Sequence, residues 1–276
     1  MSTLAKVSTT AVGVALIRAR ESEREDRLLN DPYARAFGDA ARTSYREAPD
    51  TWAMVEQLVD GFYEGRIVGV RVFDDLVRDA VDAGLTQIVL LGAGLDTRAF
   101  RLDLPADVRL FEVDVPEMIA FKEPILRELG AEPTCGRTVV AADLREDWSS
   151  RLIEAGFRRD VPTLWLEEGV LGYLPREQAR AVLTTVTGLT AAGSRFIAGA
   201  LKVDESAEHY RKLKEFVGSE AQPSRGLGPD PATWLREIGW ATEFRAWDDL
   251  AAPLGRGVAT GDPDNGLVLA TRHQER

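Results

Sequence analysis

Short apolar runs alternate with helical apolar stripes over most of the chain after about residue 85. Ile88–Leu91 is an unbroken apolar run that begins with β-branched residues, which is typical of a strand covered on both faces of a parallel sheet. Similar runs, separated by helical stretches, predict further strands at Val108–Val113, Thr138–Ala141, Pro162–Glu167 and Arg195–Leu201. Strands that alternate with helices predict a mostly parallel sheet with right-handed crossovers.

The two ends of the chain depart from this rhythm. The N-terminal part carries apolar residues at helical spacing, and we predict a helical cap at about 1–84 on a core at 85–276. Residues 204–230 are polar and then rich in Gly, Pro and Ser, which predicts a lid-like excursion over the sheet edge. The last two predicted strands, Thr242–Trp247 and Gly266–Thr271, have no predicted helix between them and suggest an antiparallel hairpin. A seventh, antiparallel strand would distinguish this sheet from a six-stranded dinucleotide fold.

Composition narrows the classes of function. The chain has 276 residues, of which 45% are hydrophobic and 29% charged, as in ordinary globular proteins. The net charge of −11 argues against nucleic acid or an anionic membrane as a partner, because binding to phosphates needs an excess of Lys and Arg. Cys135 is the only cysteine and there are two histidines, so we expect neither an intrachain disulfide nor a metal site. No signal peptide or membrane segment is recognisable, and we predict a cytoplasmic protein.

Gly92 and Gly94 follow the first strand directly, with Ala93 between them, and residues 92–96 form the predicted floor of a cofactor site. Glycine permits a sharp turn and a close approach of a ligand to the backbone. The carboxyl edge of an α/β sheet is where nucleotide-like ligands bind. Thr97 stands in place of the third glycine of a dinucleotide fingerprint, so a nucleoside without a pyrophosphate fits better. A tight turn without a ligand is the alternative.

An acidic residue ends the second predicted strand. Asp114 lies twenty positions after Gly94 (114 − 94), and a carboxylate at this place commonly accepts both hydroxyls of a ribose. Glu112 points to the opposite face if the strand continues. The alternative is that the carboxylate caps the helix that Pro116 begins.

Two further acids follow the third and fourth predicted strands. Asp143 can accept a hydrogen bond from an exocyclic amine such as adenine N6, with the backbone N–H of Leu144 serving the ring nitrogens, or it can cap a helix. Glu168 suits a cationic amine, and its neighbour Glu167 competes for this role. The row of acids favours a ligand with ribose, adenine and a cationic amino-acid part over triphosphates or NADP, which carboxylates repel.

The stretch Leu91–Leu102, Leu-Gly-Ala-Gly-Leu-Asp-Thr-Arg-Ala-Phe-Arg-Leu, resembles the signature of the leucine carboxyl methyltransferase-like family of S-adenosylmethionine-dependent enzymes, in its bacterial O-methyltransferase branch. Further matching stretches are Asn30–Ala34, Phe111–Pro116, Ala142–Arg145 and Glu167–Leu174. This ordered set is far more specific than Gly-x-Gly alone and spans about residues 10 to 200. The C-terminal quarter resembles the family only loosely.

The resemblance implies an α/β class I methyltransferase (Rossmann-like) fold, with a seven-stranded, mostly parallel sheet of order 3-2-1-4-5-7-6 and a helical N-terminal cap. It implies S-adenosyl-L-methionine as cofactor and S-adenosyl-L-homocysteine as product. In the implied site Gly92 and Gly94 pass under the methionine part, Asp114 holds the ribose, Asp143 and Leu144 hold adenine, and Glu168 holds the methionine amine. Ala93 and Val115 are predicted contacts beside them.

One family feature is missing. Family members bind the methionine carboxylate with an Arg-Thr pair before an Asp-rich helix, whereas this chain has Gly69-Val70 at that place. Arg71 and Arg66 are the candidates to replace it, although both also fit as solvated helix charges. Arg18 is a further candidate, at the family's basic position in the cap.

Together these features predict an O-methyltransferase that acts on a small-molecule carboxylate or hydroxyl, with a polyketide-like acceptor of secondary metabolism. Methyl transfer from a sulfonium is an in-line displacement, so the enzyme aligns donor and acceptor and excludes water. A carboxylate acceptor is already ionised near neutral pH. A phenol usually needs a base, for which His209 and Tyr210 are the candidates. Tyr173 either lines the acceptor pocket or simply packs.

Three other functions are weighed against this one. The first is methylation of a protein's C-terminal carboxylate. The second is a protein that binds S-adenosylmethionine without turnover, which the missing Arg-Thr pair keeps open. The third, an NAD-dependent oxidoreductase, is disfavoured by Thr97 and by the row of acids. The oligomeric state does not follow from the sequence.

Overall fold

The computed structural model describes residues 6–200, 225–228, 230–256 and 259–273. His209, Tyr210 and almost all of the predicted excursion at 204–230 lie outside the described residues. Within the described ranges, no helix combines the length and the apolar character needed to cross a membrane.

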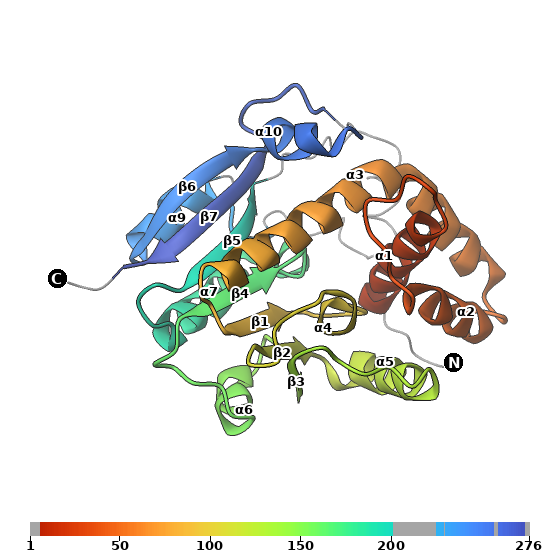
Figure 1. Ribbon diagram of the computed structural model, residues 1–276, viewed down its shortest axis with the longest axis horizontal. Coiled ribbons are helices and arrows are strands. Elements are labelled where there is room, and N and C mark those ends of the chain that lie inside the picture. The colour runs from red at the N-terminus through yellow and green to blue at the C-terminus, as the bar shows by residue number, and fades with distance from the viewer. Residues whose placement is uncertain (1–5, 201–224, 229, 257–258, 274–276) are drawn as a thin grey trace.

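The described strands form one seven-stranded sheet with the order β3-β2-β1-β4-β5-β7-β6 (Figure 1). This order confirms the predicted α/β fold. Strands β1 to β5 pair in parallel, and β7 pairs antiparallel with both β5 and β6. The strands are β1 (Gln87–Leu91), β2 (Arg109–Asp114), β3 (Gly136–Ala141), β4 (Thr163–Glu167), β5 (Arg195–Ala200), β6 (Trp240–Ala246) and β7 (Gly266–Arg272).

The first four strands end in register at one edge of the sheet. Leu91 at the end of β1 faces Val113 on β2 and Glu167 on β4, and Asp114 faces Ala141 on β3. Because these strands are parallel, the segments that follow them leave the sheet at the same edge. The predicted row of residues after the strands therefore lies on one side of the molecule.

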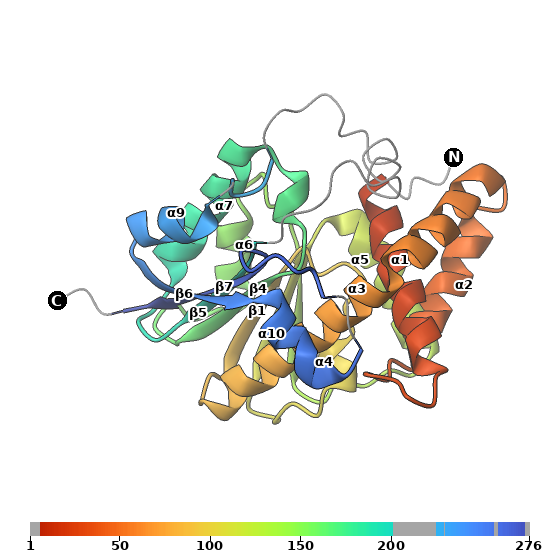
Figure 2. The ribbon, with the colours of Figure 1, turned by 90° about the horizontal axis from the view of Figure 1, so that it is seen from above.

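Helices cover both faces of this sheet (Figure 2). Ile88 and Leu90 of β1 pack into the hydrophobic cluster on one face, while Val89 and Leu91 pack into the cluster on the other. Side chains alternate between faces along a strand, so a strand covered on both faces is apolar throughout. The first face is covered by α3 (Pro49–Asp82), α5 (Pro116–Glu128) and α10 (Trp247–Ala251), and the second by α6 (Trp148–Glu154), α7 (Arg176–Leu189) and α9 (Pro231–Glu237).

The N-terminal cap consists of α1 (Lys6–Ser22), α2 (Ala34–Ser44) and the first part of α3. Pro49 begins α3, as expected for a residue without an N–H to satisfy. This helix has 34 residues, or about 51 Å at 1.5 Å per residue. Val12 of α1 and Phe37 of α2 share one hydrophobic cluster with Ile88 of the sheet. The cap and the core are thus packed together through α3, and a division near residue 84 stays a prediction.

The connection from β6 to β7 differs from the expected one. The two strands pair antiparallel as predicted, but the expectation of no helix between them is wrong, because α10 and the 3₁₀ turn η2 (Ala252–Leu254) lie there. The buried Trp247 of α10 lies 3.6 Å from the position that a Cβ on Gly69 of α3 would take. The sequence signal for α10 is short, and its packing against α3 stabilises it.

Candidate active site

The glycine loop turns sharply at the end of β1. Gly92 and Gly94 have φ angles of +64° and +52°, which glycine adopts without the strain of a side chain. The N–H groups of Gly92 and Ala93 both donate to the Val113 carbonyl, at 2.9 and 3.1 Å, so the loop folds over the end of β2. A Cβ at Gly92 would lie 2.5 Å from the Cβ of Val170. The absence of a side chain at position 92 therefore serves close packing against the segment after β4.

Asp114 joins the second strand to this loop. Its Oδ2 accepts a hydrogen bond from the N–H of Gly94 at 2.5 Å, and its Oδ1 accepts one from Val115 at 2.7 Å. Burial raises the pKa of the carboxyl, although the two N–H donors oppose this shift. Each carboxylate oxygen has a further lone pair, so the group can still accept hydrogen bonds from a ligand. The structure thus places the predicted ribose acid in direct contact with the glycine loop.

Asp143 lies on the turn after β3, and it is not the cap of the following helix. Asp147 caps α6 by accepting from the N–H of Ser150. Asp143 instead binds the guanidinium of Arg145, at 2.9 Å from its Nε, and this bond lowers the pKa of the carboxyl. The Leu144 side chain is buried, and its N–H makes no hydrogen bond within the described ranges. The predicted pair for an adenine edge thus stands at the same sheet edge as Asp114.

The two acids at the end of β4 have separate roles. Glu167 is buried and accepts hydrogen bonds from the N–H groups of Gly169 and Leu171, at 3.2 and 3.1 Å, which fixes the turn into η1 (Leu171–Tyr173). Burial raises the pKa of this carboxyl. Glu168 is the half-buried neighbour, with its Oε1 3.8 Å from Nη1 of Arg66 on α3. Glu168 is therefore the acid of this pair that faces a charged group across the sheet edge.

Arg98 is the centre of an ion-pair network that our sequence reasoning missed. This residue begins α4 (Arg98–Arg101), is almost fully buried, and contacts three carboxylates. Its partners are Asp74 at 2.7 Å, Asp96 at 2.5 Å and Glu168 at 2.8 Å. The network ties α3, the glycine loop and the turn after β4 to one another. The family signature contains Asp96 and Arg98, but nothing in its spacing shows partners 24 and 70 positions away.

The arginines of this network also lower the pKa values of Asp96 and Asp74. Burial raises the pKa of Asp96, but the cationic Arg98 and Arg101 outweigh burial and lower it to about 2. Arg101 in turn binds Asp74 through its Nη2 at 2.8 Å. These acids are ionised at neutral pH and paired within the protein.

Arg18, a predicted cofactor residue, is used to hold the cap onto the glycine loop. It is buried, with its Nε 2.8 Å from Asp31 and its Nη2 2.6 Å from the carbonyl of Leu95. Asp31 also accepts from the hydroxyl of Thr97 at 2.6 Å and from the N–H of Ala34 at the start of α2. The structure therefore places Arg18 behind the loop, where its charge is neutralised by Asp31.

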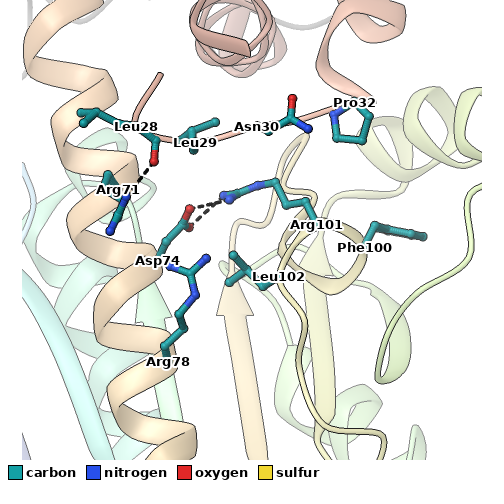
Figure 3. A pocket seen from close by; sticks show the side chains of 10 residues that line it. All are labelled: Leu28, Leu29, Asn30, Pro32, Arg71, Asp74, Arg78, Phe100, Arg101 and Leu102. Carbon is teal, nitrogen blue, oxygen red and sulfur yellow. Dashed lines mark hydrogen bonds and ion pairs between the residues drawn. The ribbon is translucent and has the colours of Figure 1, made fainter. Parts of the chain in front are cut away.

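Arg71 lies on a different face of α3 from Arg66. Its Nε binds Asp75 at 2.9 Å. Its Nη1 donates to the Leu28 carbonyl, as Figure 3 shows. Arg71 and Asp74 line a pocket of about 310 Å³ between α3, the segment 28–32 and α4 (Figure 3). None of the carboxylates at the strand ends lines this pocket. Of the two candidates for the missing arginine, only Arg66 is adjacent to Glu168.

Tyr173 is half-buried at the end of η1, next to the start of α7. Its carbonyl accepts a hydrogen bond from Nη1 of Arg225 at 2.8 Å. The other predicted acceptor-side residues, His209 and Tyr210, are outside the described ranges, so their roles stay predictions.

Comparisons with known proteins identify the family of this chain. Residues 11–187 match the family described as leucine carboxyl methyltransferase. A Frankia alni protein named "Putative S-adenosyl-L-methionine-dependent methyltransferase" is 44% identical over 274 residues, which cover 97% of this chain and 95% of that protein. A Streptomyces avermitilis protein with the same designation is 37% identical over 280 residues, which cover 96% of this chain and 95% of that protein.

Solved structures share the fold. The crystal structure of "a putative methyltransferase" from Thermobifida fusca has a TM-score of 0.53 and 20% identity, and covers 94% of this chain and 95% of its own. That of a DUF574 family protein from Streptomyces avermitilis has a TM-score of 0.53 and 16% identity, with coverage of 95% and 97%. At these identities the likeness concerns the fold alone. The family match and the two closely covering sequence relatives go further: the chain belongs to the leucine carboxyl methyltransferase family and is an S-adenosyl-L-methionine-dependent methyltransferase.

Proposed function

We propose that this enzyme transfers the methyl group of S-adenosyl-L-methionine to an oxygen of a small-molecule carboxylate or hydroxyl. The family that matches residues 11–187 is named for carboxyl methylation, which supports an oxygen acceptor. The proposed acceptor is a metabolite of the polyketide-like kind made in secondary metabolism. The proposed compartment is the cytoplasm, where a chain with one free cysteine stays reduced.

The observation that carries the proposal is the direct contact between Asp114 and the glycine loop. Asp114 lies at the same edge of the sheet as the acids that follow the neighbouring strands. A carboxylate beside Gly94 is placed to accept both hydroxyls of the ribose. Asp143 and the Leu144 N–H offer one acceptor and one donor, the pattern that the adenine edge requires. The groups present thus fit an adenosyl ligand along the edge from β1 to β3.

The amino-acid end of the cofactor would lie between Glu168 and Arg66. The 3.8 Å separation of their charged atoms is longer than a hydrogen bond, so this loose pair can open and exchange its partner for the charges of a ligand. A methionine part carries an ammonium and a carboxylate on one carbon, which complements an acid and a base that face each other. We therefore assign the ammonium to Glu168 and the carboxylate to Arg66, one helical turn before the family's missing arginine.

When bound, S-adenosyl-L-methionine supplies an electrophilic methyl group on a sulfonium. The protein has to orient the donor, admit an oxygen on the far side of that methyl group and exclude water. We assign the acceptor side to half-buried Tyr173, which follows the turn that carries Glu168. A carboxylate acceptor enters already ionised and requires no general base from the protein.

Calorimetry with S-adenosyl-L-methionine tests the donor half of this proposal. Replacing Asp114→Ala should weaken binding by about 1–3 kcal/mol, or about 5- to 150-fold, since the ribose hydroxyls lose their acceptor. Asp107→Ala, which removes an exposed acid on the loop before β2, is the matched control. Equal affinities of the two variants would refute the ribose role of Asp114.

Product analysis tests the acceptor half. Incubation with panels of carboxylic acids, phenols and peptides that end in a free carboxylate should give methyl esters or methyl ethers of small acceptors. Methylation of the peptides alone would favour protein C-terminal carboxyl methylation. A methyl group on nitrogen, carbon or sulfur would overturn the oxygen assignment.

A further inference from the structure

Three arginines gather where α7 begins, shortly after Tyr173. Arg176 and Arg180 lie four positions apart on α7, which places them on one face of this helix. Arg225 forms an isolated β-bridge with Pro175, and Arg180 Nη2 lies 3.5 Å from the Leu227 carbonyl. The turn 225–228 therefore crosses the first turns of α7. A Cβ on Gly228 would lie 3.3 Å from Arg176 Nε.

These three residues, the arginine cluster, have no neutralising acid among the residues that the structure describes. Within the described ranges no carboxylate lies within ion-pair distance of any of them. The Nε atoms of all three are buried without a hydrogen-bond partner. Their recorded acceptors are backbone carbonyls, of Tyr173 for Arg225 and of Leu227 for Arg180, although each guanidinium carries about five N–H donors.

The more deeply buried arginines of this protein have carboxylate partners. Arg18, Arg98 and Arg137 each contact a carboxylate at 2.8 Å or less. A net charge of −11 makes carboxylates plentiful. Buried donors without acceptors are unfavourable, and like charges held together repel. An arrangement of this kind is stabilised when an anion binds it, and guanidinium groups match the two oxygens of a carboxylate or a phosphate.

We propose that the arginine cluster binds an oxyanion, a carboxylate or a phosphate, that the methyl acceptor carries apart from the oxygen that receives the methyl group. This inference rests on the proposed function for the identity of the ligand. Tyr173 connects the two sites, because it follows the Glu168 turn and its carbonyl holds Arg225. Three half-buried charges in an acidic protein suit a small ligand with one or two negative charges, and they suit a polyanion poorly.

Titration with inorganic phosphate and with succinate tests the site without any knowledge of the acceptor. The wild-type protein should bind at least one of the two saturably, and the stronger binder identifies phosphate or carboxylate as the preferred group. Binding should weaken at least about tenfold in Arg176→Gln and in R176Q/R180Q, and affinity for S-adenosyl-L-methionine should stay within about twofold. Arg127→Gln, an exposed arginine on α5, is the charge-matched control and should bind like wild type.

Two further measurements test whether a loss of anion binding results only from unfolding of the variant. Arg180 stacks over Trp234 at 5.2 Å, so R176Q/R180Q must first show a folded transition on heating. Arg176→Lys keeps the charge and should retain part of the affinity. Absence of saturable binding by the wild-type protein, or equal binding by wild type and Arg176→Gln, overturns the site.

Methyl transfer to matched pairs of acceptors, one with and one without a second acidic group, tests the assignment to the acceptor. In Arg176→Gln, KM for the anionic member should rise about tenfold with kcat within about twofold, and the neutral member should be unaffected. If both members respond alike, the cluster does not serve the acceptor. If neither is methylated on oxygen, the proposed function fails and the acceptor assignment with it, while the titration still decides the anion site.

Discussion

Arginines occupy two contrasting regions of this protein. Arg98, at the glycine loop, has a side chain that is 3% exposed and contacts Asp74, Asp96 and Glu168 at 2.8 Å or less. Arg176, at the start of α7, is half-buried with its Nε unpartnered and no carboxylate of the described chain nearby. The same side chain is thus fully paired in one region and unpaired in the other.

The contrast separates a structural role for arginine from a role in ligand binding. A buried ion is tolerated when its countercharges are built into the fold, and removing one partner then leaves a buried uncompensated charge. Arg98 therefore maintains the relative positions of α3, the glycine loop and the turn after β4. A cationic group without a built-in countercharge is free to take its countercharge from a ligand, which is the role we give to the arginine cluster.

The largest expected effect is on folding stability at Arg98. Replacing Arg98→Met removes the direct ion-pair partner of Asp96 and leaves Asp74 and Glu168 with only Arg101 and Arg66, and should lower the free energy of unfolding by about 3–5 kcal/mol. Denaturant unfolding monitored by circular dichroism measures it, with Arg127→Met as the exposed control. A loss below about 1 kcal/mol would show that the network is not what holds these elements together.

A smaller effect should appear as a pH dependence at Asp96. The pKa of this carboxyl is about 2 in the folded protein, below its ordinary value of 3.8. The ionised form is therefore favoured by folding, and its stabilisation of about 2 kcal/mol is complete above about pH 5 and lost as the pH falls towards 2. The difference in unfolding free energy between wild type and Asp96→Asn should shrink over that range. A difference that stays constant from pH 7 to pH 2.5 would contradict the assigned ion pairs.

Replacement of Arg66 should have a smaller effect, and it should affect the binding of S-adenosyl-L-methionine and not the stability of the fold. Arg66→Gln should weaken S-adenosyl-L-methionine binding by about 1–2 kcal/mol, or about 5- to 30-fold, because the side chain is 37% exposed and water screens its charge. Decarboxylated S-adenosyl-L-methionine should bind the variant and the wild type alike. Arg71→Gln is the matched control on the same helix and should leave both affinities unchanged. The reverse pattern, with Arg71 sensitive and Arg66 not, would move the carboxylate to the pocket of Figure 3.

The smallest expected effect is that of replacing Arg176 on folding stability, which contrasts with the effect at Arg98. Arg176→Gln should change the free energy of unfolding by less than about 0.5 kcal/mol, because no ion pair is broken. Thermal unfolding without added anions measures this change. A loss of several kcal/mol would mean that Arg176 has a structural partner, and the two regions would then be alike.

The sequence predicted what depends on local pattern. Apolar runs such as Ile88–Leu91 located the strands, and their order followed from the family resemblance. The residues after the strands could be foreseen because parallel strands share a carboxyl edge, which brought Asp114 to Gly94. Two features could not be foreseen, because they depend on contacts between distant segments. One is that Arg66, and not Arg71, lies beside Glu168, and the other is the set of acids around Arg98.

The junction at Asp31 has a consequence for how reactants enter and leave. This one carboxylate receives hydrogen bonds from Arg18 of the first helix and from Thr97 beside the cofactor loop. Moving the first helix away would take Arg18 from this buried carboxylate and leave it only the more distant guanidinium of Arg101, at 4.0 Å, which is unfavourable. We therefore expect the first helix to stay packed against the glycine loop during turnover, and the reactants to enter and leave elsewhere.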